Sequence, residues 1–205
     1  MAFLTEQDRR KIESAIVAAE RTTSGELVAV VAQAADDYRH VLFLWPALAA
    51  LLLPALLLTI APGMSAWTLY LAQAGTFLLL AVLAQLPPVR MALVPDAMQR
   101  RCASQLAREQ FLEQRLHLTR AHTGVLLFVS VAEHYVEIIA DEGINARVPP
   151  DTWDKAVADF VARVRAGRIA EGFLAVVEVV EARLAEHFPR PPDDRDELPN
   201  RVIEI

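Results

Sequence analysis

The most distinctive pattern along the chain is a long block without charged side chains in its first half. From Val41 to Val89, 49 consecutive residues include no Asp, Glu, Lys, Arg or His. A helix needs about 20 apolar residues to cross a bilayer. The turn sequence Ala61-Pro62-Gly63 divides the block into two stretches of that length, residues 41–60 and 64–86. The pattern predicts a transmembrane hairpin over residues 41–89, and the alternative is a buried pair of helices in a soluble protein.

Positive charges flank this block on both sides. Arg39 precedes it, Arg90 and Arg101 follow it, and the turn at 61–63 carries no charge. Basic residues are enriched on the cytoplasmic side of membrane helices. We therefore expect both termini to be cytoplasmic, with the turn on the other side of the membrane.

The segment before the block, residues 1–40, has the pattern of one helix followed by one strand. Thr5 and Asp8 resemble a capping box at the start of the helix, and Gly25 is expected to end it in a left-handed conformation. Residues 26–33, ELVAVVAQ, are apolar on both faces, which is typical of a buried strand.

The segment after the block, residues 90–188, predicts a mixture of helices and strands. We expect a helix over residues 95–118, a strand over 124–131, a second strand over 135–141 paired with it as a hairpin, a helix from Pro149-Pro150 to Gly167, and a helix over 169–187. The remaining residues, 189–205, are rich in proline and charge and are predicted to be mostly disordered.

Neither flanking segment can bury its apolar residues alone. The strand at 26–33 needs partners on both sides, and only the downstream strands can supply them. A parallel pair also needs a long crossover, which the hairpin and the helix after it provide. The sequence therefore predicts one α/β domain that the hairpin interrupts.

Composition narrows the classes of partner. The formal net charge is −6 and no segment is dense in Lys or Arg, so we expect no nucleic-acid partner. Cys102 is the single cysteine and cannot form an internal disulfide. The first 40 residues do not read as a signal peptide, because charged residues interrupt their start.

Polar residues at the strand ends are the candidate chemistry. If the strands pair as expected, Glu26, Thr123, Asp141 and Glu142 gather at one edge of the sheet, and Asp36, Asp37 and Glu133 lie at the other. Carboxylate and hydroxyl oxygens are ligands for calcium or magnesium, so the first set is a candidate cation site. The alternative is that these side chains are solvated or act as caps. We identify no catalytic residues and no other cofactor.

Three stretches carry a family resemblance. "AERTTSGELVAVVA", "TGVLLFVSVAEHYVEIIADEGI" and the "RAGRIAEGF…FP" ending resemble, in this order and spacing, the TPM domain, a family named for a thylakoid-lumen phosphatase, a photosystem II repair protein and a nematode receptor-associated protein. The chain looks most like the bacterial membrane-protein branch, whose members carry an internal pair of spans. The resemblance implies an α/β/α sandwich around a small mixed sheet of three to four strands, and location in the bacterial inner membrane.

The resemblance also implies bound calcium in some members and acid phosphatase activity in the plant member. This sequence departs from the family pattern at three places. Thr123-Gly124-Val125 replaces Asp/Asn-Gly-Val, His134 replaces an Arg, and Asp141-Glu142-Gly143 replaces Gly-Tyr-Gly. The departures favour a non-catalytic accessory module that acts on other membrane proteins, and the alternative is a divalent-cation-dependent acid phosphatase.

Overall fold

The computed structural model describes residues 3–149, 151–191, 197–198 and 201–205, and the chain divides into two compact units. One unit combines Met1–Ala35 with Cys102–Ile205, and the other is Asp36–Arg101. We call them the α/β unit and the hairpin unit. The hairpin unit is thus an insertion between the first strand of the α/β unit and the rest of its chain.

The elements of the α/β unit begin with one helix and one strand and continue after the insertion. In chain order they are α1 (Glu6–Glu20), β1 (Glu26–Ala32), the end of α5 (Asp96–Glu113), the 3₁₀ helix η1 (Leu116–Leu118), β2 (Gly124–Ser130), β3 (Tyr135–Ala140), α6 (Glu142–Asn145), α7 (Asp151–Arg165), α8 (Ile169–His187) and β4 (Val202–Glu204).

The strands form one mixed sheet in the order β3-β2-β1-β4. β1 pairs in parallel with β2, and Glu26 lies opposite Gly124. β2 pairs in antiparallel orientation with β3. The parallel pairing predicted across the insertion and the predicted hairpin of β2 and β3 are both confirmed.

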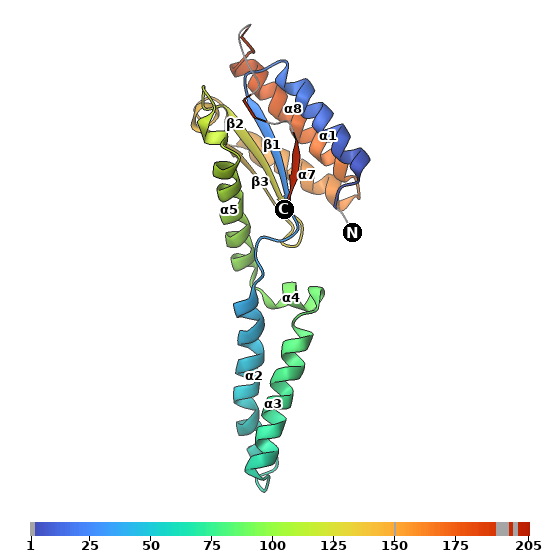
Figure 1. The fold of residues 1–205 in the computed structure, drawn as a ribbon, viewed down its shortest axis with the longest axis vertical. Coiled ribbons are helices and arrows are strands. Elements are labelled where there is room, and N and C mark those ends of the chain that lie inside the picture. Colours follow the sequence, from blue (N-terminus) through green and yellow to red (C-terminus); the bar gives the residue numbers. More distant parts are fainter. Residues whose placement is uncertain (1–2, 150, 192–196, 199–200) are drawn as a thin grey trace. The chain divides into compact units, whose positions relative to one another are not determined.

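Helices cover both faces of this sheet (Figure 1). Alternate residues of β1 and β2 contribute to two separate cores, because successive side chains of a strand point to opposite faces. Leu127 lies in the core that includes residues of α1, α7 and α8. Phe128 lies in the core that includes Ala103 and Ala107 of α5. The α/β/α sandwich implied by the family resemblance is confirmed.

The helix ends follow their local chemistry. Thr5 is the N-cap of α1 and accepts a hydrogen bond from the backbone N–H of Asp8, as predicted. Gly167 after α7 has φ 75°, which only glycine adopts without strain. Gly25, by contrast, does not adopt the left-handed conformation that we predicted. A side chain at Gly25 would collide with Leu184 of α8 instead.

Two further predictions are wrong. The helix predicted over 95–118 ends at Glu113, and the left-handed Arg115 leads into the separate turn η1. The tail 189–205 is ordered at its end, because β4 adds to the free edge of β1 with Ala29 opposite Val202. Val202 is fully buried. Its pairing with β1 stabilises β4, although the neighbouring sequence, rich in charge and proline, does not predict a strand. The tail residues 192–196 and 199–200 lie outside the described residues.

The hairpin unit consists of α2 (Arg39–Ile60), α3 (Ala66–Leu83), α4 (Pro87–Leu93) and the beginning of α5. α2 and α3 are long and apolar enough to cross a membrane. Pro46 and Pro54 lie inside α2, a position that membrane helices tolerate.

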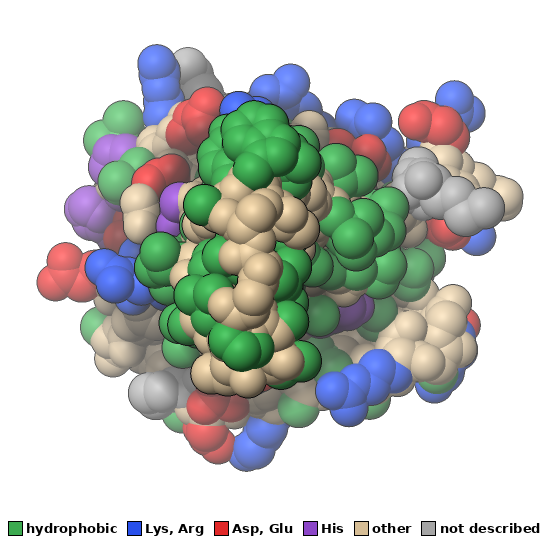
Figure 2. Space-filling model, turned by 90° about the horizontal axis from the view of Figure 1, so that it is seen from below, with side chains coloured by type: hydrophobic (Ala, Val, Ile, Leu, Met, Phe, Trp, Pro, Cys, Tyr) green, Lys and Arg blue, Asp and Glu red, His purple; other side chains and the backbone are tan. Residues whose placement is uncertain are grey.

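The apolar side chains of α2 and α3 are largely exposed. Leu52 is 67% exposed and Val82 is also 67% exposed. Figure 2 colours hydrophobic side chains green, and many of them lie on the surface in this view. These helices therefore do not form a buried core, which is the alternative considered from the sequence.

Candidate functional site

The candidate site lies at the edge of the α/β unit where β1 and β2 begin and β3 ends. The backbone N–H of Glu26 donates to the carbonyl of Thr123 at 3.2 Å, and that of Asp141 donates to the carbonyl of Gly124 at 2.9 Å. The strand pairings thus place Glu26, Thr123, Asp141 and Glu142 at one edge of the sheet. We call these four residues the acid edge.

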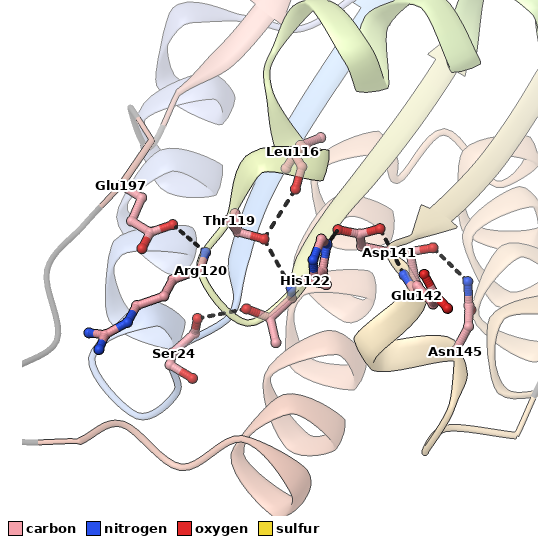
Figure 3. Close-up of polar contacts among 11 residues, drawn as sticks. Ser24, Leu116, Thr119, Arg120, His122, Asp141, Glu142, Asn145 and Glu197 are labelled. Carbon is pink, nitrogen blue, oxygen red and sulfur yellow. Dashed lines mark hydrogen bonds and ion pairs between the residues drawn. The ribbon is translucent and has the colours of Figure 1, made fainter.

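Asp141 makes two side-chain contacts at the acid edge (Figure 3). It is the N-cap of α6, and its Oδ1 accepts from the backbone N–H of Glu142 at 2.8 Å. Its Oδ2 lies 3.2 Å from Nδ1 of His122. The Asp141 side chain is 13% exposed, whereas that of His122 is 61% exposed. The carboxylate therefore has a structural task at the start of α6 and an imidazole partner that solvent can reach.

Thr123 belongs to a short network of hydroxyl groups. Its side chain, which is buried, donates to the carbonyl of Ser24 at 3.0 Å. Its backbone N–H donates to the Thr119 hydroxyl at 3.0 Å, and this hydroxyl in turn donates to the carbonyl of Leu116 at 3.1 Å. The network fixes the loop before β2, and Thr123 contributes its hydroxyl hydrogen to the backbone of Ser24.

The carboxyl-terminal segment reaches the acid edge through Glu197. Oε1 of Glu26 accepts from the backbone N–H of Glu197 at 3.0 Å. The Glu197 carboxylate accepts from the backbone N–H of Arg120 at 3.1 Å. Glu26 is only 5% exposed.

Glu142 differs from the other members because its side chain is exposed. Within the part of the chain that the structure describes, no group of three or more His, Cys, Asp or Glu side chains is arranged to hold a metal ion. Calcium or magnesium binding by Glu26, Thr123, Asp141 and Glu142 thus stays a prediction. The structure shows that the four residues lie at the same edge of the sheet and that Glu26, Thr123 and Asp141 each have hydrogen-bond partners of their own.

Three contributors to this edge were not found from the sequence. His122 carried no signal of its own, because its partner Asp141 lies 19 residues later, after the β2–β3 hairpin. Thr119 and Glu197 carried no signal of their own. Glu197 lies in the tail that we expected to be mostly disordered.

Comparison with known proteins bears on the same region. Residues 87–183 match the family model of the TPM domain. This segment of the chain thus belongs to a TPM domain. The matched segment runs from α4 to α8 and includes β2 and β3, whereas α1 and β1 lie before it. Since β1 is the central partner of β2, the folded α/β unit extends beyond the matched residues.

A solved structure shows the same fold. The NMR structure of the BA42 protein from the psychrophilic bacterium Bizionia argentinensis matches with a TM-score of 0.62 and 22% sequence identity. The match covers 100% of this chain and 97% of that one. No curated protein matches the chain in sequence. The likeness to BA42 therefore supports the fold of the TPM domain and leaves its activity to be argued from the residues.

The opposite edge of the TPM domain holds Glu133. This buried carboxylate accepts from the Ser130 hydroxyl and, through Oε1, from the backbone N–H of Ala35 at 3.0 Å. Ala35 is the last residue before the hairpin unit. Asp36 and Asp37, which we expected to join Glu133, belong to that other unit. Glu133 thus holds Ala35, the residue at which the chain leaves the α/β unit.

Proposed function

We propose that the protein is a membrane-anchored TPM-domain protein of the bacterial inner membrane, and that its TPM domain binds another membrane protein without catalysing a reaction. The observation that supports membrane anchoring is the exposed apolar surface of α2 and α3. Of the 18-residue spans in these helices, 22% and 6% respectively are buried. An apolar surface of this extent is unfavourable in water and is favourable in lipid.

The arginines around the hairpin support an orientation with both termini in the cytoplasm. The test labels single cysteines in a Cys102→Ser background, in intact cells. A cysteine in place of Gly63 is expected to react with an impermeant reagent from outside. A cysteine in place of the exposed Arg168 is expected to react only after lysis. Labelling of the Arg168 position in intact cells would reverse the proposed topology.

The bonds within the acid edge support a non-catalytic role. Asp141 caps a helix and lies beside His122, Glu26 accepts from Glu197, and Thr123 donates to Ser24. These contacts explain the polar residues as elements of structure. The most direct search for a partner is chemical cross-linking in membranes, followed by purification of the full chain. A chain recovered without a cross-linked membrane protein counts against the proposal.

A cation-dependent phosphatase is the second candidate, and the pair formed by His122 and Asp141 is the observation that favours it. An imidazole 3.2 Å from a carboxylate can accept or donate a proton, and Glu26 and Glu142 lie at the same edge. This candidate requires a cation to offset the repulsion among the three carboxylates.

One experiment separates the two candidates. Calcium is added to the purified full chain while its melting temperature and its hydrolysis of an aryl phosphate are measured. The accessory role predicts no calcium-dependent shift and no hydrolysis. The phosphatase predicts a shift, since a bound ligand stabilises the folded state, and loss of both effects in Asp141→Asn. Asp154→Asn, an exposed acid on α7, is the matched control.

A further inference from the structure

A pocket lies in the α/β unit where β2 ends and β3 begins, away from the acid edge. Its volume is about 190 Å³, and it lies among the end of β2, the beginning of β3, the last turns of α7 and Phe3. Val129 and Phe160 contribute to its apolar wall and are almost fully buried. Val161 and Val164 of α7 extend this wall. Side chains of the apolar core therefore form part of the pocket wall.

Two side chains that can carry positive charge also line this pocket. They are His134, in the turn between β2 and β3, and Arg165, the last residue of α7, and both are exposed. No carboxylate of the described residues forms an ion pair with Arg165, whereas the neighbouring Arg163 and Arg168 both pair with Glu171. The guanidinium of Arg165 is thus available to an external anion.

The backbone at His134 gives an independent reason to examine this place. His134 has φ 50°, a left-handed conformation that costs free energy for a residue with a side chain. Such conformations occur in turns and are also concentrated at binding sites. Here the conformation belongs to a residue that lines the pocket.

The size and composition of the pocket define the ligand. Its volume of about 190 Å³ is below the roughly 300–1,000 Å³ of pockets that bury a drug-sized ligand, which favours a small molecule. Apolar walls favour a hydrocarbon chain. Arginine binds carboxylates through two parallel hydrogen bonds. The combination fits a short alkyl chain that ends in a carboxylate.

We propose that this pocket, with Arg165 and His134 at its polar side, binds a short-chain alkyl carboxylate. The hydrocarbon contacts Val129, Phe160 and Val161, and the carboxylate pairs with Arg165. The site is separate from the acid edge and does not depend on the proposed function of the protein. No covalent chemistry is involved.

The test uses the full chain in lipid nanodiscs, with empty nanodiscs as the blank, and hexanoate as the probe. Titration followed by ligand-observed NMR is expected to show saturable binding of hexanoate. Hexylammonium, which has the same chain and the opposite charge, is expected to bind about tenfold more weakly or not at all, because losing about 1.4 kcal/mol of charged pairing corresponds to a factor of ten.

Variants locate the site. Arg165→Gln is expected to weaken hexanoate binding about tenfold, on the same physical basis, and the matched control Arg168→Gln to leave it unchanged. Val161→Trp is expected to fill the pocket and abolish binding, provided that its melting temperature is retained. Arg165 is exposed, so Arg165→Gln tests the site even if Val161→Trp unfolds. Absence of saturable hexanoate binding, equal binding of hexylammonium, or equal effects of the two arginine variants would overturn the proposal.

Discussion

The same kinds of side chain occupy opposite environments in the two units of this protein. In the α/β unit, Leu126 and Phe128 are fully buried. In the hairpin unit, Leu52 is 67% exposed and Leu79 is 61% exposed. Both regions contain many apolar residues. The difference lies in what surrounds these side chains: other side chains in the first case, and the environment outside the protein in the second.

The charged residues show the complementary difference. On the α/β unit, exposed ion pairs such as Lys155 with Asp151 and Arg183 with Glu186 lie on the surface helices. Between Val41 and Val89 the chain has no charged residue at all. A surface that carries ion pairs is compatible with water, whereas a surface of leucines without charges is compatible with lipid. Three predictions test this contrast.

The largest effect is expected from truncating a buried side chain. Phe128→Ala should lower the free energy of unfolding of the α/β unit by about 3–5 kcal/mol, because it removes a buried ring and leaves a cavity. Leu52→Ala, at an exposed position, should change it by less than about 0.5 kcal/mol. Hydrogen exchange of the β2 amides measures both values. Similar losses in the two variants would contradict the difference in environment.

A charge placed on an exposed leucine gives the next largest effect and separates lipid from water. Leu52→Arg should reduce the fraction of chain that resists alkaline extraction from membranes, because arginine at the centre of a span costs about 2.5–3.5 kcal/mol. Leu118→Arg is the matched control, since Leu118 of the α/β unit is 65% exposed. If both variants stay in the membrane fraction equally, the hairpin is not a lipid-facing element.

The smallest effect concerns an ion pair on the α/β unit. A hydrogen bond from Lys155, together with its positive charge, lowers the pKa of Asp151. A carboxylate with a lowered pKa in the folded state stabilises the fold above its ordinary pKa, and this stabilisation is lost as pH falls through the folded value. Lys155→Met should return the pKa of Asp151 toward its ordinary value. NMR titration of the Asp151 carboxyl measures this, and an unchanged pKa would remove Lys155 as the cause.

Local and repetitive patterns were enough to predict most of the fold. The helix Ile169–His187 was placed correctly from its apolar periodicity, and the Thr5 cap from two residues three apart. The parallel pair β1–β2 followed from a strand that is apolar on both faces and therefore needs a neighbour on each side. These inferences rest on residues close together in the sequence or on one strong requirement for burial.

The features that were missed depend on partners far along the chain. β4 exists because β1 offers an open edge, and only Val202 of its three residues is fully buried. Gly25 is small because Leu184 packs against it. His122 meets Asp141 through the β2–β3 hairpin, and Glu197 meets Glu26 through β4. Each of these contacts becomes predictable only after the order of strands in the sheet is known.

The position of β1 in the sheet has a consequence for how the protein is made. β1 is synthesised first among the strands, yet its two neighbours are β2, which follows the entire hairpin unit, and β4, which lies at the end of the known sequence. During translation, an apolar strand must therefore wait with both edges unpaired, a state that favours aggregation. Both long helices have left the ribosome before β2 exists. The sheet gains β4 only after α8 has been made, so until then β1 has a single neighbour.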